Sequence, residues 1–351
     1  MYTYIERAPQ VCRDILDAGV ERVGALAEQF CARDYRRILM VASGSSYNIA
    51  LSMCEFMQRT LGIEVGATWP MSYILYNHAQ ASDTFVLCLS QSGKSTNTIE
   101  AVRRAQACGH DVAVLTTNGQ APIHETCDAV YEYGSGSDDY YVAKGYPSSC
   151  TFLASFTIEA AARRGSIDEA ARARLLAGLG AAVDGLAPVM GESQAFFQKH
   201  IDRVLRTRRI MTVGIGAGYG VALEGALKLN EMTGIAANAY EMEEFVHGPT
   251  YEIRKDHVVM LVDQGGPGHA RLMQLYQALH LLTDAVFVID NTGDYAGDLV
   301  MRLPGAADPG LNILQDVVPF QVLAESLCSA LDLLSYNFSN YDFEQEMKTK
   351  A

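Results

Sequence analysis

The sequence predicts an α/β protein made of two tandem, doubly wound parallel-sheet domains with connecting helices. Its 351 residues correspond to about two domains of roughly 150 residues each, and 49% of them are apolar, which is enough for a core in each domain. The chain also carries an internal repeat. Within each copy, short apolar runs alternate with longer stretches of helical periodicity, a pattern typical of parallel sheets covered by helices on both faces.

The repeat is seen when the sequence is aligned with itself at an offset of 172 residues. The segment ILMVASGSSYNIAL, from Ile38, then lies over IMTVGIGAGYGVAL, from Ile210. At the same offset VLCLSQSG, from Val86, lies over VVMLVDQG, from Val258. Two copies of one domain explain both matches.

The apolar runs predict three strands in each copy, and the periodic stretches between them predict helices. The expected strands cover residues 37–42, 84–89 and 111–116 in the first copy and 209–214, 257–262 and 285–290 in the second. The expected helices cover residues 46–60, 95–108, 148–164, 217–233, 269–283 and 317–336.

These elements divide the chain into five segments. An N-terminal helical segment, 1–34, is expected to pack across a domain or a partner, and it precedes the first sheet domain, 35–165. A helical connector, 166–200, is rich in Ala, Leu and Gly and leads to the second sheet domain, 201–340. Residues 341–351 form a C-terminal tail. Within the first domain, the run GSGSDD predicts a flexible loop.

Charge balance and cysteine spacing argue against several classes of function. With 41 acidic and 27 basic side chains the protein repels phosphate backbones, so we expect no nucleic-acid partner. The first residues include an early Glu and no apolar core of signal-peptide length, and no run of about 18 apolar residues occurs, so we expect a cytoplasmic protein with no membrane partner. The eight cysteines lack Cys-x-x-Cys spacing and the eight histidines lack a His-Glu-x-x-His pair. Buried reduced thiols are therefore expected, with no disulfide, no bound metal and no cofactor.

Two glycine-rich patterns resemble nucleotide sites but fail on spacing. In GIGAGYG the G-x-G-x-x-G count from Gly214 reaches Tyr219, and the count from Gly216 reaches Val221, so no dinucleotide is expected. In SQSGKST, Lys94 lacks the preceding G-x-x-x-x-G spacing of a nucleotide-hydrolysing loop.

Six serines stand in the two strand-to-helix turns of the first copy, which is where open parallel sheets bind ligands. The turns read Ser43-Gly44-Ser45-Ser46 and Ser90-Gln91-Ser92-Gly93-Lys94-Ser95. Hydroxyls, backbone amides and the helix dipole together favour a small phosphate or carboxylate. The plainer interpretation is that these serines are helix N-caps. The second copy has GIGAG and VDQGG at these places and lacks the hydroxyls, so we expect one phosphate pocket rather than two.

The helix that opens the second copy places Glu224, Lys228 and Glu231 at i, i+4 and i+7, on one face. A surface helix often carries such a stripe as a simple ion pair. The surrounding positions are mostly Val, Ala, Leu and Gly, however, so the helix is expected to be largely buried. Charges on a buried helix next to a ligand-binding turn indicate a functional site.

His247 stands further along the second copy and is followed by Gly-Pro, a tight turn in which an imidazole ring can be exposed. Three acids close in sequence, Glu241, Glu243 and Glu244, could orient the ring or stabilise its charged form. A lone histidine is more often structural, and this one gains functional weight from the acids and from the charged helix.

In these motifs the sequence resembles the tandem sugar isomerase (SIS) domain proteins. The nearest patterns are those of the isomerase half of glucosamine-fructose-6-phosphate aminotransferase and of related phosphosugar isomerases, deaminases and Amadori-product deglycases. The likeness covers roughly 35–340 and rests on GSSYN at 44–48, LSQSGKSTNT at 89–98, ALEGALKLNE at 222–231 and EEFVHGP at 243–249. It implies two SIS-type, flavodoxin-like domains, the first binding a sugar phosphate and the second supplying acid–base residues.

The resemblance implies a role for each matched residue. Glu231 would be the base that moves a proton between C1 and C2 of the sugar, with Lys228 beside it and Glu224 as a further candidate. His247 would open the sugar ring or act as acid. In such proteins this histidine commonly comes from the neighbouring subunit, so a homodimer with a shared active site is implied. The implied set that holds the 6-phosphate comprises Gly44, Ser45, Ser46, Ser90, Gln91, Ser92 and Ser95.

The sequence departs from the aminotransferase pattern in three places. It begins MYTY, without an N-terminal nucleophilic Cys or a glutaminase domain, so glutamine-dependent synthesis of glucosamine 6-phosphate is not expected. Where relatives often have a Ser-Thr-Lys run, this chain reads VAKGYP from Val142. The tail lacks the Pro- and Arg-containing run that precedes a catalytic Lys. Lys348 and Lys350 are candidates to replace it, although solvated tail charges are the default interpretation.

We therefore expect a phosphosugar aldose–ketose isomerase or deaminase, acting on a keto- or amino-sugar 6-phosphate by Glu/His proton transfer through an enediol-like intermediate. An Amadori-product deglycase, which splits a fructosamine 6-phosphate with the same Glu and His, is the alternative within this class. A non-catalytic sugar-phosphate sensor is the alternative of another class. Such a sensor would need the serine turns but would have no use for Glu231 or His247.

Overall fold

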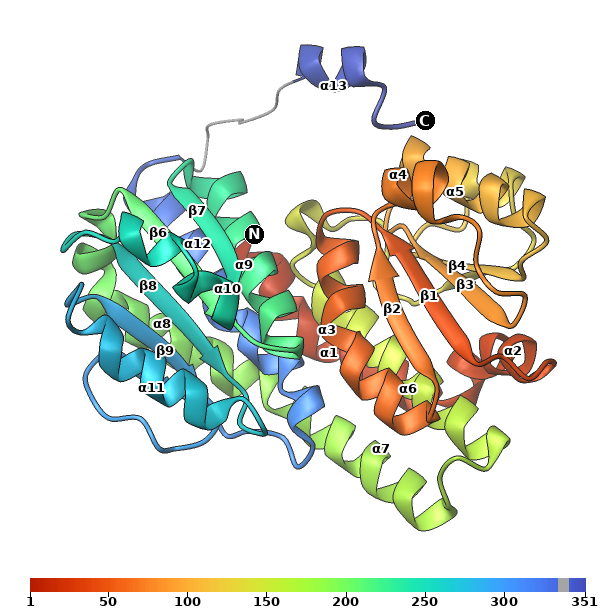
Figure 1. The fold of residues 1–351 in the computed structure, drawn as a ribbon, viewed down its shortest axis with the longest axis horizontal. Helices are drawn as coiled ribbons and strands as arrows, with labels where there is room; N and C mark the ends of the chain where they lie inside the picture. The colour runs from red at the N-terminus through yellow and green to blue at the C-terminus, as the bar shows by residue number, and fades with distance from the viewer. Residues whose placement is uncertain (334–340) are drawn as a thin grey trace. The chain divides into compact units, whose positions relative to one another are not determined.

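The computed structural model describes residues 1–333 and 341–351, which fold into two compact units. The first unit comprises residues 10–177 with the tail 341–351, and the second unit comprises residues 1–9 with 178–333. Each unit contains a five-stranded, all-parallel sheet with helices on both of its faces (Figure 1). The predicted fold of two doubly wound α/β domains is confirmed.

The two sheets have the same strand order. The first runs β2-β1-β3-β4-β5, with β1 (Arg37–Ala42), β2 (Glu64–Thr68), β3 (Thr84–Leu89), β4 (Val112–Thr116) and β5 (Val130–Glu132). The second runs β7-β6-β8-β9-β10, with β6 (Arg209–Gly214), β7 (Ala236–Glu241), β8 (Val258–Asp263), β9 (Val286–Asp290) and β10 (Val300–Arg302). This is the flavodoxin-like order, whose ligand crevice opens between its first and third strands. That crevice falls between β1 and β3 in the first unit.

The helices follow the same plan. Those of the first unit are α2 (Val20–Cys31), α3 (Ser45–Leu61), α4 (Pro70–Ser72), α5 (Thr96–Ala107), α6 (Gly145–Arg164) and α13 (Tyr341–Met347). Those of the second are α8 (Leu186–Leu205), α9 (Ala217–Thr233), α10 (Met242–Val246), α11 (His269–Leu279) and α12 (Ile313–Ala330). Helices α1 (Tyr2–Ala18) and α7 (Glu169–Asp184) each contain the residue at which the chain passes from one unit to the other.

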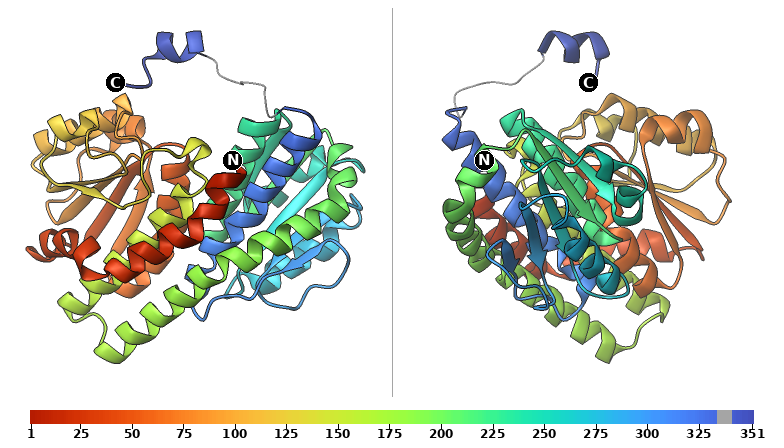
Figure 2. Two further views of the ribbon diagram at one scale, coloured as in Figure 1. Left: turned by 180° about the vertical axis from the view of Figure 1, so that it is seen from behind. Right: turned by 60° about the vertical axis from the view of Figure 1, so that its left-hand side comes forward.

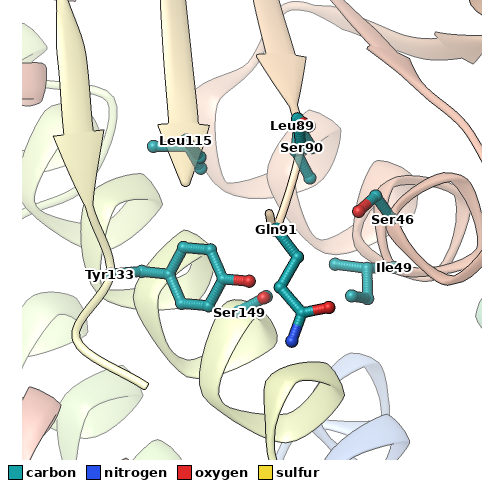
Figure 3. A pocket seen from close by; sticks show the side chains of 8 residues that line it. All are labelled: Ser46, Ile49, Leu89, Ser90, Gln91, Leu115, Tyr133 and Ser149. Carbon is teal, nitrogen blue, oxygen red and sulfur yellow. The ribbon is translucent and has the colours of Figure 1, made fainter. Parts of the chain in front are cut away.

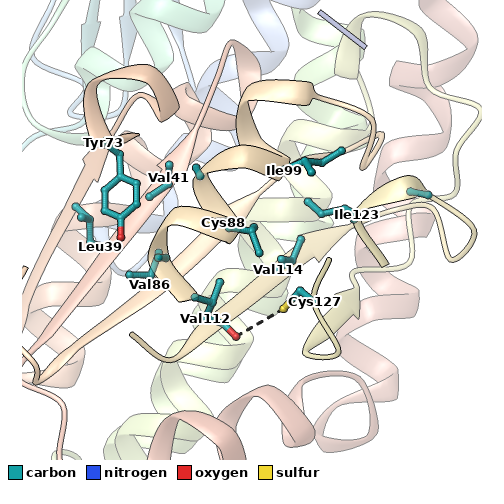
Figure 4. Close-up of a cluster of buried hydrophobic side chains, with 14 residues drawn as sticks. Leu39, Val41, Tyr73, Val86, Cys88, Ile99, Val112, Val114, Ile123 and Cys127 are labelled. Carbon is teal, nitrogen blue, oxygen red and sulfur yellow. Dashed lines mark hydrogen bonds between the residues drawn. The ribbon is translucent and has the colours of Figure 1, made fainter. Parts of the chain in front are cut away.

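Apolar side chains are buried on both faces of each sheet. In the first unit Val41, Val86 and Val114 pack with Ile99 of α5 on one face (Figure 4). The opposite face is covered by α3 and α6, which pack against each other. In the second unit α12 packs against α8 and α9, and the green α8 and blue α12 lie side by side in Figure 2. Burial on both faces explains why the central strands read as uninterrupted apolar runs.

The six predicted strands are present, and four edge strands, β2, β5, β7 and β10, were not predicted. The expected helices are present with shifted ends. The helix expected at 269–283 ends at Leu279, and the one expected from 148 begins at Gly145. The helix expected at 317–336 begins at Ile313, and its last three residues lie outside the described part of the chain. The expected N-terminal and connector helices are observed as α1, α2, α7 and α8.

Strand pairing corrects the internal alignment by one residue. Ile38 pairs with Phe85 in the first sheet, and its counterpart Ile210 pairs with Val258 in the second. Phe85, and not Val86, is therefore the counterpart of Val258. The sequence did not decide between them because both residues are apolar.

The corrected register changes which residues correspond after these strands. Counting on from Phe85 and Val258 makes Ser90 the counterpart of Asp263 and Gln91 the counterpart of Gln264. The second unit thus has a carboxylate where the first has a serine hydroxyl.

The helical stretch Glu169–Leu205, formed by α7 and α8, is long and apolar enough by length and composition to cross a membrane. It contains no uninterrupted run of about 18 apolar residues, so the sequence analysis did not identify it. In the second unit α8 packs along α12 and buries Leu186, Val189 and Phe197. This packing accounts for part of its apolar composition.

The eight cysteines are free thiols, as expected. Cys12, Cys88, Cys127, Cys150 and Cys328 are buried. The expectation of burial is wrong for Cys108, which is exposed just after the end of α5.

Candidate active site

Two serine-containing turns of the first unit meet at a small cavity beside the carboxyl ends of β1 and β3. Ser46, in the first turn of α3, lines this cavity together with Ser90 and Gln91, which follow β3 directly (Figure 3). The cavity measures about 10 Å³, which is space for about one water, so only part of a larger ligand could enter it. Its remaining wall is formed by Ile49, Leu89, Leu115, Tyr133 and Ser149.

Ser90 contributes a buried hydroxyl to this wall. The residue is 3% exposed, and its Oγ has no hydrogen-bond partner among residues 1–333 and 341–351. Residues at and just after the end of β4 hold the turn that carries Ser90. Thr116 Oγ1 and Thr117 Oγ1 both donate to the carbonyl oxygen of Gln91, at 3.0 and 2.9 Å. A buried hydroxyl without a partner costs free energy. A ligand oxygen that reaches Ser90 would remove that cost.

The geometry argues against the N-cap interpretation of the serines. Gly44, with φ of 56°, occupies the N-cap of α3, a left-handed conformation that glycine adopts without strain. Ser95 occupies the N-cap of α5 but makes no side-chain cap hydrogen bond. Ser92 Oγ accepts a hydrogen bond from the N–H of Lys94 at 3.3 Å. Of the predicted phosphate-binding set, three residues line the cavity, and Gly44, Ser45, Ser92 and Ser95 flank it in the turns.

A carboxylate that sequence reasoning missed lies beside Gln91. Asp139 accepts hydrogen bonds from Gln91 Nε2 at 3.2 Å and, at the start of α6, from the N–H groups of Ala143 at 3.1 Å and Gly145 at 2.6 Å. Burial raises the pKa of Asp139, and these N–H groups offset only part of that rise. An ionised carboxylate only accepts hydrogen bonds, so Asp139 fixes the direction of the Gln91 amide.

The neighbouring Lys144 is the lysine of the VAKGYP segment. Its side chain is fully buried, and its Nζ lies 2.5 Å from Asp138 Oδ1. A buried ammonium is retained only when opposite charge and hydrogen bonds compensate its lost hydration. The run Asp-Asp followed by a lysine at the head of an apolar helix was the available sequence signal.

The C-terminal tail lies against the second serine turn. Lys350 forms an isolated antiparallel bridge with Ser95. Thr96 donates its N–H to the carbonyl of Thr349 at 3.3 Å and its Oγ1 hydroxyl to that of Lys348 at 2.7 Å. These contacts use main-chain atoms of the tail, so they hold the tail to the turn whatever its side chains are.

In the second unit the three predicted charges of α9 lie together. The side chains of Glu224 and Lys228 are fully buried, and that of Glu231 is 37% exposed. Lys228 Nζ lies 2.6 Å from Glu231 Oε2 and 3.4 Å from Glu224 Oε1. We call these three side chains the charged ladder of α9. The ladder begins in the core at Glu224 and ends at Glu231, a carboxylate that solvent can reach.

Burial and charge shift the pKa values of this ladder. Burial raises the pKa of Glu231, and the nearby Lys228 ammonium offsets only part of the rise. Burial lowers the pKa of Lys228, but the two carboxylates outweigh it and leave that pKa raised. A carboxylate with a raised pKa, held beside a permanent cation, is suited to remove and return a proton near neutral pH.

His247 is exposed and directly follows α10. Two of the acids expected to orient it are engaged elsewhere. Glu241 accepts hydrogen bonds from the N–H groups of Glu243 and Glu244, at 2.8 and 3.1 Å, and so caps α10. Glu243 forms a two-pronged ion pair with Arg271, at 2.5 and 3.0 Å. These carboxylates therefore shape the turn that presents His247. The pKa of Glu243 is lowered, first by the hydrogen bond from Arg271 and to a smaller extent by the charge of His247.

Known proteins share the sequence pattern. Residues 204–302 match the family model described as SIS domain. The chain is 26% identical over 330 residues to a glutamine–fructose-6-phosphate aminotransferase of Caulobacter vibrioides, a match that covers 91% of this chain and 54% of the relative. An aminotransferase of the same name from Mycobacterium leprae is 29% identical over 328 residues, covering 85% of this chain and 49% of the relative. The chain thus spans about half the length of these curated relatives.

Solved structures share the fold. A Clostridium difficile 630 protein assigned as a phosphosugar isomerase has a TM-score of 0.88 at 22% identity, covering 99% of this chain and 98% of that chain. The C-terminal domain of glucosamine-fructose-6-phosphate aminotransferase from Francisella tularensis has a TM-score of 0.83 at 19% identity, with 94% and 95% covered. Glucosamine-6-phosphate deaminase from Thermotoga maritima has a TM-score of 0.68 at 18% identity, with 92% and 95% covered. The resemblance to SIS-domain proteins is confirmed.

Proposed function

We propose that this SIS-domain chain is a cytoplasmic phosphosugar isomerase or deaminase, acting on a keto- or amino-sugar 6-phosphate. Relatives and structural neighbours named as aminotransferase, phosphosugar isomerase and deaminase support the enzyme class. The observation that carries the proposal is the charged ladder of α9. It places a carboxylate of raised pKa at the accessible end of a buried ion pair, Glu224–Lys228.

In the proposed mechanism the first unit holds the phosphate. The unpartnered Ser90 hydroxyl, with Ser46 and Gln91, receives its oxygens, and the flanking turn residues Gly44, Ser45, Ser92 and Ser95 surround them. Holding the phosphate positions the sugar carbons for proton transfer and so supplies part of the rate acceleration.

The second unit supplies the acid and the base. Glu231 removes the proton next to the carbonyl or imine carbon and returns it to the neighbouring carbon, while Lys228 keeps the carboxylate ionised and compensates charge on the enediol-like intermediate. His247 serves in ring opening or as acid. Because His247 is exposed on a turn, we propose a homodimer in which this residue completes the site of the neighbouring subunit.

Two alternatives use the same residues differently. An Amadori-product deglycase would apply Glu231 and His247 to a fructosamine 6-phosphate and release an amine with a hexose phosphate. A sugar-phosphate sensor would keep the serine turns and perform no chemistry. The buried charge of α9 favours an enzyme, because a sensor gains nothing from the cost of desolvating Lys228 and Glu224.

The experiment is incubation of the protein with fructose 6-phosphate, glucosamine 6-phosphate and fructosamine 6-phosphates, with products identified by mass spectrometry. Interconversion of hexose 6-phosphates or release of ammonia supports the proposal, and release of a larger amine indicates the deglycase. Glu231→Gln is expected to lower kcat by about 10² to 10⁴ with little change in sugar-phosphate affinity. Glu192→Gln, at an exposed position of α8, is the matched control. Turnover of none of these sugars by the wild-type protein would contradict an enzymatic role.

A further inference from the structure

The turn after β8 corresponds, by strand register, to the cavity-lining turn after β3 but differs from it in chemistry. Asp263 is the counterpart of Ser90, and both are followed by a glutamine. Two residues further on, Gly93 and Gly266 both adopt left-handed backbone, with φ of 63° and 80°. The backbones differ between these points, because Gly265 also has a positive φ, of 79°, whereas its counterpart Ser92 does not. At the end of the strand the first unit has the hydroxyl of Ser90 and the second has the carboxylate of Asp263.

The Asp263 carboxylate is fully buried and surrounded by donors. Its Oδ1 accepts the N–H of Gly265 at 2.9 Å. Its Oδ2 accepts from His269 Nδ1 at 2.8 Å and from the Tyr295 hydroxyl at 2.6 Å. His269 is the first residue of α11, so the carboxylate also lies at the positive end of a helix.

These groups have the composition of a binding site for a small anion. A backbone N–H, a hydroxyl, an imidazole and a helix start are the donors that proteins use for phosphates and carboxylates. The hydrogen bond to Asp263 raises the pKa of His269, which favours the imidazolium and hence a charged donor. The side chain of Tyr295 is 1% exposed, and its hydroxyl points at the carboxylate rather than at solvent.

We propose that Asp263 is a built-in anion. Its carboxylate fills, in the second unit, the place that the anionic group of a ligand takes in the first, and this unit therefore binds no phosphosugar of its own. The correspondence with the first unit rests on the proposed function. The internal anion itself rests on the contacts of Asp263.

Charges around the turn agree with this assignment. Asp294 contacts the other face of the His269 ring, with its Oδ2 3.1 Å from Nε2. Asp290, at the end of the next strand, is fully buried. A dianionic phosphate approaching this turn would meet three carboxylates, whereas at the turn after β3 the carboxylate of Asp139 is held by Gln91 and by N–H groups at the start of α6. The surroundings of Asp263 thus already carry negative charge, which disfavours a second anion there.

The test removes the internal carboxylate and offers a free one. Asp263→Ala leaves the donors of Gly265, His269 and Tyr295 around a space the size of a carboxylate. We expect its Tm to fall below that of the wild type, and then to rise by about 2 to 4 °C more in sodium formate than in sodium chloride of equal concentration. The wild-type Tm should respond equally to the two salts, because its site is already filled.

Asp263→Asn is the matched control. Its amide fills the space but directs an N–H group at the donors of the site, so its Tm should fall without a formate-specific rise. If Asp263→Ala does not fold, Asp263→Ser is measured in the same way, and the yield on refolding in formate against chloride gives a second readout. A folded Ala or Ser variant with equal Tm in both salts, or an equal refolding yield, would overturn the assignment.

Formate rescue does not depend on sugar binding. A wild-type protein that binds and converts no phosphosugar would contradict the proposed function alone. Loss of stability without formate rescue would contradict the built-in anion alone.

Discussion

The turns after β3 and β8 occupy corresponding places in the two sheets and differ in the side chain at the end of the strand. In the first, Ser90 leaves a buried hydroxyl without a partner beside a small cavity. In the second, Asp263 supplies a carboxylate that accepts hydrogen bonds from Gly265, His269 and Tyr295. Duplication of the fold has therefore not preserved the side chain at this position, and under our proposal this one residue decides whether the turn is open to a ligand.

The glutamines that follow show the same contrast. Gln91 Nε2 donates to Asp139, a carboxylate otherwise occupied with the N–H groups at the start of α6. Gln264 Nε2 donates to Asp316 Oδ2 at 2.7 Å, in the core of the second unit. Asp316 is fully buried, and burial raises its pKa to about 7. In the second unit the glutamine thus binds a fully buried carboxylate, Asp316. In the first unit the glutamine binds a carboxylate, Asp139, that is only partly buried.

The largest effect on stability is expected for Lys228, on the helix that distinguishes the second unit. Lys228→Met removes the ammonium from between two carboxylates and leaves the charge of Glu224 buried. The free energy of unfolding, measured by urea denaturation, should fall by about 3 to 5 kcal/mol.

The double variant Glu224→Gln/Lys228→Met is the control for this prediction. It removes the uncompensated charge and should recover most of the loss. A single variant as stable as the wild type would show that the ladder does not hold charge in the core.

A smaller effect concerns the pH dependence of the second unit. The pKa of Asp316 is raised from an ordinary 3.8 to about 7, so between these values the folded protein binds a proton that the unfolded chain releases. The stability that this proton on Asp316 contributes to the folded state is fully present below about pH 4 and is lost as the pH rises through about 7. Urea unfolding of the wild type should therefore show a decline over this range that Asp316→Asn lacks.

The charged and polar groups that face Asp316 are Gln264, Asn291 and, by its field, Asp263. Asp263→Asn should make the decline shallower, since it removes a like charge. Identical pH profiles for the wild type and Asp316→Asn would contradict a protonated Asp316 in the folded state.

The smallest effect is expected for the tail. Deletion of residues 341–351 removes the main-chain contacts to Thr96 and should weaken sugar-phosphate binding by about threefold, the worth of one net hydrogen bond. Lys348→Ala and Lys350→Ala keep those contacts and should bind like the wild type, as measured by calorimetry. A loss of turnover of about a hundredfold in either lysine variant would instead assign that side chain to catalysis.

The sequence predicted the central strands because they are buried on both faces. β3 and β8 are buried along their whole length and read as plain apolar runs. The missed strands are edges, where residues such as Glu64 in β2 and Glu132 in β5 are exposed and break the pattern. Edge strands are specified by pairing with a neighbour, which no local pattern records.

Part of the site was also predictable. Helical spacing brought Glu224, Lys228 and Glu231 together on one face because the geometry of a helix is local. The cavity residues Tyr133 and Ser149 come from other parts of the first unit, after β5 and within α6, and only tertiary folding places them beside Ser90. The correspondence of Asp263 with Ser90 could not be predicted, because it requires Phe85 rather than Val86 to be the counterpart of Val258. The sequence fits either choice, since both residues are apolar.

The most direct test of the account is a calorimetric titration with the hexose 6-phosphate that the wild type converts. The proteins titrated are the wild type, Ser90→Ala and Glu231→Gln. Ser137→Ala, at an exposed position, is the control. We expect the wild type, Glu231→Gln and the control to bind one ligand per chain with similar Kd. We expect Ser90→Ala to bind about ten- to a hundredfold more weakly, since it removes a hydrogen bond to a charged group. Unchanged affinity in Ser90→Ala, or two ligands per chain in the wild type, would contradict a single anion site in the first unit.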